Sequence, residues 1–172
     1  MAELLKGAPV ARALTEELVA RCAALRERGV VPTLAIVRVG EREDDLSYER
    51  GALKRCEKVG IEARRVLLPA DVSQDELLAA IEGINADPTV HGCLMFRPLP
   101  AGLDEDAVAA ALDPAKDVDS MTPASLLTTL SGRGEGFTPC TAEAVGQRSR
   151  SSVGRWRLAV PLPPCLRLAM PQ

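Results

Sequence analysis

Three short segments that read as strands, separated by segments of helical periodicity, constrain the fold of this chain more than any other feature. The three segments span residues 32–40, 62–68 and 90–96. The first and third are almost wholly apolar, which is typical of strands buried on both faces of a parallel sheet. Helices between consecutive strands favour parallel pairing, because each strand must begin at the same edge. We therefore expect an α/β fold, a three-layer βαβ arrangement with a parallel sheet flanked by helices.

The helices expected around these strands share apolar residues spaced three and four positions apart. They are expected at residues 9–28, 46–59, 73–85 and 104–112. Gly29 follows the first helix as a C-terminal cap would, and Ser73 with Glu76 forms a capping box. Residues 120–136 are a mixed, turn-rich stretch without clear periodicity.

The carboxyl ends of the strands are the expected site, because open parallel sheets bind ligands there. The loops that follow the first and third strands, residues 40–48 and 97–102, are therefore the candidate site loops.

Composition and charge argue against several classes of protein. The formal net charge of −3 argues against a general nucleic-acid surface, and no apolar run reaches the length of a membrane span. Glu3 and Lys6 interrupt what would be the apolar stretch of an export signal, so we expect a cytoplasmic protein. The cysteines form no C-x-x-C pair and His91 is the only histidine, which indicates no metal site and favours buried, inert thiols.

Several motifs occur in order along the first 145 residues. They are Ser47-Tyr48 through Gly60-Ile61, then Pro98-Leu99-Pro100, then Asp113-Pro-Ala-Lys-Asp-Val-Asp119, then Pro139-Cys140-Thr141. Together they resemble the bifunctional methylenetetrahydrofolate dehydrogenase/methenyltetrahydrofolate cyclohydrolase family. The resemblance implies that this part is the N-terminal catalytic domain, which binds tetrahydrofolate derivatives. It also implies a second, Rossmann-type domain for NADP, and family members commonly form homodimers.

The resemblance implies catalytic roles for Tyr48 and Asp119. Tyr48 matches the tyrosine that lies against the substrate, and Asp119 matches the aspartate that hydrogen-bonds the pterin ring. A flat heterocycle can stack on an aromatic face, and a carboxylate can accept two parallel N–H bonds. The alternative for Asp119, with its motif set aside, is a loop carboxylate that caps a nearby turn. The other substrate-binding positions implied are Ala52, Met95, Phe96, Arg97, Pro98, Leu99 and Pro100, with Arg55 as a further candidate.

The chain departs from the family pattern at two positions. The family has a lysine four residues after the tyrosine, on the same helix face, and the resemblance assigns it to proton management in the cyclohydrolase step. Ala52 stands there, and Phe96 followed by Arg97 replaces the glutamine partner of that lysine. Arg55, seven residues after Tyr48, returns to the same face. It could supply fixed positive charge near the substrate or its glutamate tail, or be a solvated surface arginine.

The composition changes abruptly near residue 147. Residues 147–172 contain five arginines, no acidic residue and the only tryptophan, Trp156. They lack the Gly-Arg-Ser element through which the family enters its cofactor-binding domain, although codons shifted by two bases can encode it. We therefore expect a folate-binding catalytic domain at 1–145 and an aberrant or disordered basic tail at 146–172, read out of frame, with the NADP domain missing. A nucleic-acid-binding arm is the disfavoured alternative.

The expected function is tetrahydrofolate one-carbon interconversion with NADP as cofactor, both implied by the resemblance. Hydride transfer needs a domain that holds the nicotinamide against the folate, and no cofactor-binding residue is expected in this chain. Two alternatives stay open. Ala52 favours a catalytically silent folate-binding fragment, and the altered tail favours a non-functional product of a frameshifted gene.

Overall fold

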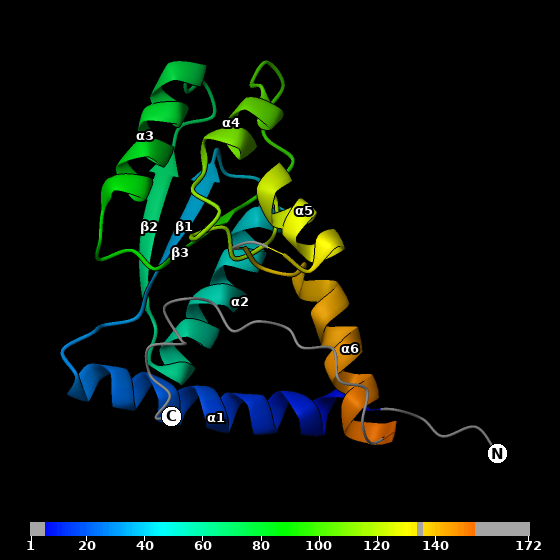
Figure 1. The fold of residues 1–172 in the computed structure, drawn as a ribbon. Helices are drawn as coiled ribbons and strands as arrows, with labels where there is room; N and C mark the ends of the chain where they lie inside the picture. The colour runs from blue at the N-terminus through cyan, green and yellow to red at the C-terminus, as the bar shows by residue number, and fades with distance from the viewer. Residues whose placement is uncertain (1–5, 134–135, 154–172) are drawn as a thin grey trace.

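The computed structural model describes residues 6–133 and 136–153, which form three strands and six helices (Figure 1). In chain order the elements are α1 (Gly7–Glu27), β1 (Thr33–Val39), α2 (Glu43–Val59), β2 (Glu62–Leu68), α3 (Gln74–Ala86), β3 (Gly92–Met95), α4 (Glu105–Ala111), α5 (Pro123–Ser131) and α6 (Cys140–Val153). The strands form one parallel sheet in the order β2-β1-β3. The predicted α/β fold with a parallel sheet is confirmed.

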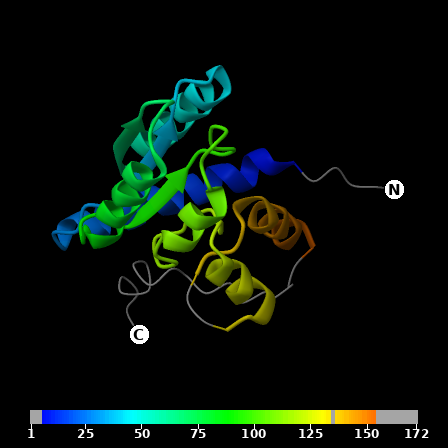
Figure 2. The ribbon, with the colours of Figure 1, turned by 90° about the horizontal axis from the view of Figure 1, so that it is seen from above.

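The central strand β1 pairs along its whole length with β2, from Thr33 opposite Glu62 to Val39 opposite Leu68. On its other side it pairs with the shorter β3. β2 is an edge strand with alternating exposure, whereas the side chains of β1 are nearly all buried. Beyond β3, an isolated parallel bridge joins Cys93 to Asp117, and α5 and α6 lie on this side of the sheet, away from β2 (Figures 1 and 2).

The two faces of β1 differ in chemistry, because successive side chains of a strand point to opposite faces. Ala35, Val37 and Val39 belong to the main apolar core, together with residues of α3 and α4 such as Leu77 and Val108. On the other face, the guanidinium of Arg38 reaches α2 and pairs with the carboxylate of Glu49 at 2.7 Å. A buried ion pair therefore joins α2 to the centre of the sheet.

The predicted caps are present. The hydroxyl of Ser73 accepts from the backbone N–H of Glu76 at 3.3 Å, and the Glu76 carboxylate accepts from the backbone N–H of Ser73 at 3.0 Å. Gly29 has a φ of 79° after the end of α1, where the N–H of Val30 donates to the carbonyl of Leu25 at 2.9 Å. This is the six-to-one bond of a Schellman cap, which requires the left-handed conformation that glycine adopts without cost.

Two expectations about helices were wrong. The helix expected to begin at Leu46 begins at Glu43, because the three acidic residues of its first turn favour the positive end of the helix dipole. The stretch 120–136 contains α5, which Thr122 caps through its side chain and Gly132 ends in the left-handed conformation. Its leucines Leu126, Leu127 and Leu130 are all exposed, so the apolar residues of this helix mark no buried face.

The expected domain boundary falls inside a helix, since α6 continues to Val153. Residues 154–172, which include Trp156, lie outside the described residues. The division into a domain at 1–145 and an aberrant tail at 146–172 therefore stays a prediction. No helix in the described part of the chain is long and apolar enough to cross a membrane.

Candidate functional site

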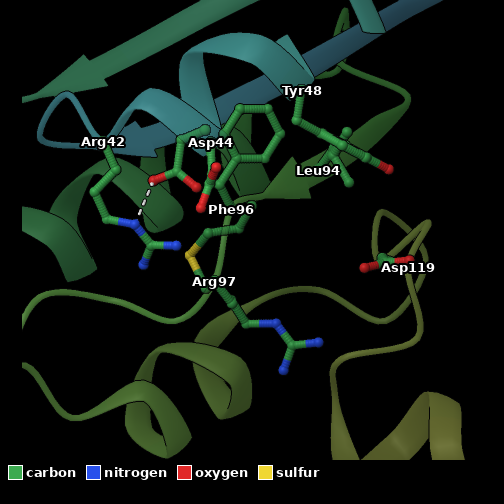
Figure 3. Close-up of a pocket in the computed structure, with 9 residues that line it drawn as sticks. Arg42, Asp44, Tyr48, Leu94, Phe96, Arg97 and Asp119 are labelled. Atoms are coloured by element: carbon green, nitrogen blue, oxygen red, sulfur yellow. Dashed lines mark ion pairs between the residues drawn. The ribbon is translucent and has the colours of Figure 1, made fainter. Parts of the chain in front are cut away.

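A cavity of about 320 Å³ lies at the carboxyl edge of the sheet, where the parallel strand order predicted a site. Its wall comes from the start of α2, the end of β3 and the loop after the β3-bridging residue Asp117 (Figure 3). We call it the first cavity. It is lined by Arg42, Asp44, Asp45, Tyr48, Leu94, Met95, Phe96, Arg97 and Asp119.

An aromatic pair forms one wall of the first cavity. The rings of Tyr48 and Phe96 meet edge to face, with centroids 5.4 Å apart and an interplanar angle of 90°. Phe96 is 7% exposed and anchored in the protein, whereas Tyr48 is 64% exposed. Edge-to-face contact stabilises the tyrosine ring while leaving one of its faces free for a flat ligand.

Two charged residues that precede Asp119, Lys116 and Asp117, hold the loop that carries it. The ammonium group of Lys116 donates to the carbonyls of Ile84, Asn85 and Asp87 at 2.7, 2.9 and 2.7 Å. It thereby caps the C-terminal end of α3, where backbone carbonyls lack partners. The motif residue Lys116 is therefore structural.

Asp117 is fully buried and also structural. Its carboxylate accepts from the backbone N–H groups of Met121 and Thr122 at 2.9 and 2.8 Å. Ser120 has a φ of 56°, the only positive φ of a non-glycine residue in the described part of the chain. This tight turn buries Asp117 and leaves Asp119 half-buried beside the cavity.

Cys140 brings the Pro-Cys-Thr motif next to Asp119. Its sulfur contacts the carbonyl of Val118 at 3.4 Å. Cys140 is exposed, unlike the buried thiol expected from the sequence. Partial burial of its sulfur, followed by the negative charge and hydrogen bond of Asp119, raises the pKa of this thiol. A thiol in this state is protonated and a poor nucleophile, so the contact fixes the Asp119 loop against α6 rather than supplying a reactive group.

Both arginines of the first cavity already have partners. Arg42 lies 3.5 Å from Asp45 and donates to the carbonyl of Pro98 at 3.0 Å. Arg97 lies 3.4 Å from Glu105. The Arg97–Pro98 peptide is cis. The hydrogen bond from Arg42 and the ion pair of Arg97 hold the Pro-Leu-Pro segment beside the cavity.

A second cavity of about 670 Å³ adjoins the first along one face of α2. It is lined by Asp44, Ser47, Tyr48, Gly51, Ala52, Arg55 and Leu94. Three of these residues, Asp44, Tyr48 and Leu94, also line the first cavity, so the two cavities adjoin at the tyrosine.

The structure brings most of the predicted site residues together. Tyr48, Met95, Phe96, Arg97 and Asp119 line the first cavity, and Tyr48, Ala52 and Arg55 line the second. Pro98, Leu99 and Pro100 line neither cavity, and Leu99 packs against the apolar core.

Sequence reasoning missed several lining residues. Arg42, Asp44 and Asp45 lie in the stretch 40–48 that was expected to form a site loop, so the strand-end rule would have found them. Leu94 carried no such signal, because an apolar residue within a buried strand reads as core.

The helices that follow the three strands do not offer a pyrophosphate site. A pyrophosphate binds free N–H groups at a helix N-terminus, but the helices that follow the three strands each begin with acidic residues: Glu43, Asp44 and Asp45 in α2, Asp75 and Glu76 in α3, Glu105 and Asp106 in α4. These carboxylates repel phosphate. In residues 6–133 and 136–153 no group of three or more histidine, cysteine or acidic side chains could hold a metal.

Comparison with known proteins places this chain in a family. Residues 5–119 match the family model described as tetrahydrofolate dehydrogenase/cyclohydrolase, catalytic domain. The bifunctional protein FolD of Alkaliphilus oremlandii is 44% identical over 145 residues, which make up 84% of this chain and 51% of that protein. For FolD of Carboxydothermus hydrogenoformans the identity is 46%, over 84% of this chain and 50% of that protein. The chain thus spans about half the length of these curated relatives.

Solved structures agree. The bifunctional FolD methylenetetrahydrofolate dehydrogenase/cyclohydrolase of Campylobacter jejuni superposes with a TM-score of 0.84 at 32% identity, covering 87% of this chain and 53% of that chain. The Trypanosoma brucei FolD, solved with NADP and an inhibitor, gives a TM-score of 0.79 at 31% identity, covering 88% and 52%. Sequence and fold together show that this chain belongs to the tetrahydrofolate dehydrogenase/cyclohydrolase family and contains the region of its catalytic domain.

Proposed function

We propose that the first cavity binds a tetrahydrofolate derivative and that this chain supplies the substrate-binding part of methylenetetrahydrofolate dehydrogenase/cyclohydrolase activity. The observation that carries the proposal is the convergence of Tyr48, Phe96 and Asp119 around one cavity at the carboxyl edge of the sheet. These residues come from three separate segments. An aromatic face and a carboxylate are the two groups that a flat, amino-bearing heterocycle needs.

In this proposal Asp119 orients the substrate. Its carboxylate accepts two N–H bonds from the amino-pyrimidinone edge of the pterin, while the ring system packs against Tyr48. Orientation requires a fixed carboxylate, and the hydrogen bonds of Asp117 and Lys116 hold the Asp119 loop in place. Tyr48 and Asp119 are thus the proposed substrate-contacting residues.

The hydride step of the family relies on NADP, which the Trypanosoma brucei relative was solved with. The acidic first turns of α2, α3 and α4 disfavour its pyrophosphate, and we propose that the described residues contribute the folate side of that reaction. The cyclohydrolase step needs a group that exchanges a proton, and Ala52 lacks one at the family lysine position. A catalytically silent folate-binding domain is therefore the second candidate function. A cytoplasmic location and the absence of nucleic-acid and membrane partners stay predictions.

Calorimetric titration of the full chain with a tetrahydrofolate analogue, and separately with NADP, tests the proposal. Wild type should bind the analogue, and Asp119→Asn should bind it about tenfold to a hundredfold more weakly, since hydrogen bonds to a charged group contribute about 1.5–3 kcal/mol. Asp75→Asn is the matched control, because Asp75 is exposed at the start of α3 and lines neither cavity. Absence of binding by wild type, or equal weakening by both variants, would refute the proposal.

The two candidate functions are separated by the rate of methenyltetrahydrofolate hydrolysis. Ala52→Lys together with Phe96→Gln restores the family pattern and should raise the rate above that of wild type if the lost pair matters. No gain in a variant that still binds the analogue would count against a role for Ala52 in silencing the site.

A further inference from the structure

We infer that the second cavity recognises a carboxylate-bearing tail of the ligand and that Arg55 binds this carboxylate. The inference rests on the proposed function, because it assumes that the ring system of the ligand occupies the first cavity. It adds a subsite and a specificity-determining residue to that function.

The shape of the second cavity supports an elongated ligand. Its α2 residues lie on one helical face, from Asp44 through Tyr48 and Ala52 to Arg55. At 1.5 Å per residue, the helix advances about 16 Å from the first of these residues to the last. A ligand that starts in the first cavity can therefore extend past Tyr48 along α2.

The chemistry of the wall changes along this path. Asp44 lies at the end shared with the first cavity, and Arg55 lies at the far end. Between them Tyr48, Ala52 and Leu94 provide aromatic and apolar surface. Such a wall suits a molecule with hydrogen-bond donors at one end, an apolar middle and an anion at the other end.

Arg55 is the available cation of the site. Arg42 and Arg97 are engaged with Asp45 and Glu105. Arg55 is exposed, and no carboxylate of the described residues lies within ion-pair distance of it. A guanidinium presents paired N–H donors that match a carboxylate in a bidentate geometry.

Ala52 leaves the path to Arg55 open. It lies four residues after Tyr48 and three before Arg55, so its side chain faces the same cavity. A methyl group fills little of this space, whereas a long side chain at position 52 would cross it. The substitution that removes a proton-exchanging group thus makes room for the ligand tail.

A comparison of two ligands tests the inference by calorimetry on the full chain. One is a tetrahydrofolate analogue with its carboxylate tail, and the other is the same analogue with the tail replaced by a neutral amide. Arg55→Gln should weaken binding of the first about twofold to fivefold, as for an exposed charge-assisted pair, and leave the second unchanged. Arg55→Lys should recover part of the loss because it keeps the charge.

Lys54→Gln is the matched control, since it removes a positive charge from the adjacent, exposed position of α2 that lines neither cavity. Equal effects of Arg55→Gln on both ligands, no effect on either, or the same effect from Lys54→Gln would overturn the inference alone. If wild type bound neither ligand, the proposed function itself would fail. If wild type binds both ligands, the proposed function holds, and a negative result with the variants then counts against the inference alone.

Discussion

The buried ion pair between Arg38 and Glu49 provides the sharpest test of how α2, and with it Tyr48, is held over the sheet. Glu49 is 2% exposed and Arg38 is 3% exposed. The Glu49 carboxylate accepts from Arg38 Nε at 2.7 Å and from Arg65, and Arg38 also donates to the carbonyl of Gly40. Glu49→Gln keeps the shape of the side chain and removes its charge, which leaves the guanidinium of Arg38 buried without a counter-ion.

Removing one partner of a buried ion pair costs about 3–5 kcal/mol of unfolding free energy. The value here should lie near the lower limit, because Arg38 keeps its hydrogen bond to Gly40. Arg65 contributes little, since its side chain is half exposed and solvent screens the charge. With a slope of about 2 kcal/mol per molar urea, a loss of about 3 kcal/mol lowers the unfolding midpoint by about 1.5 M.

Urea unfolding followed by far-ultraviolet circular dichroism measures this shift. Glu57→Gln makes the same chemical change at an exposed position of α2 and should cost less than about 0.5 kcal/mol. The double variant Arg38→Met/Glu49→Leu removes both charges and should recover much of the loss, because no isolated charge remains buried. If Glu49→Gln were no more destabilising than Glu57→Gln, the pair would not hold α2 on the sheet.

Three further predictions concern the loop after β3 and its neighbours. Lys116→Met should lower the unfolding free energy by about 2–3 kcal/mol, because three carbonyls at the end of α3 lose a charged donor. Urea unfolding measures this loss, and a loss no larger than that of the control Lys58→Met would contradict the prediction. Ser120→Gly should raise the melting temperature, because relief of the left-handed φ gains about 1–2 kcal/mol, whereas the added chain entropy of glycine costs about 0.5–1 kcal/mol. A lower melting temperature would refute the strain argument. Burial, aided by the charge of Asp117, raises the pKa of Cys93 from 9.0 to about 12, so its thiol contributes stability below pH 9 that is lost as the pH rises toward 12. The unfolding free energy of wild type should therefore fall more between pH 8 and pH 10 than that of Cys93→Ala, and parallel curves would count against the buried thiol.

Local signals predicted much of the fold. The capping box at Ser73 and the cap at Gly29 depend on bonds between residues a few positions apart, and both are present. The apolar runs at residues 32–40 and 90–96 predicted β1 and β3, since burial on both faces of a sheet selects Val, Ile and Leu. Helix α5 was missed although Thr122 and Gly132 are local helix signals, because its leucines are exposed and mark no buried face.

The sequence by itself determined the strands, most of the helices and the shared face of Tyr48, Ala52 and Arg55, because strand and helix periods act over neighbouring residues. Only the tertiary structure decided that Arg38, within an apolar strand, pairs with Glu49 and that Asp119 meets Cys140. Such contacts depend on how crossover helices and loops pack against the sheet. No local pattern encodes the separation of two segments that meet only after the chain has folded.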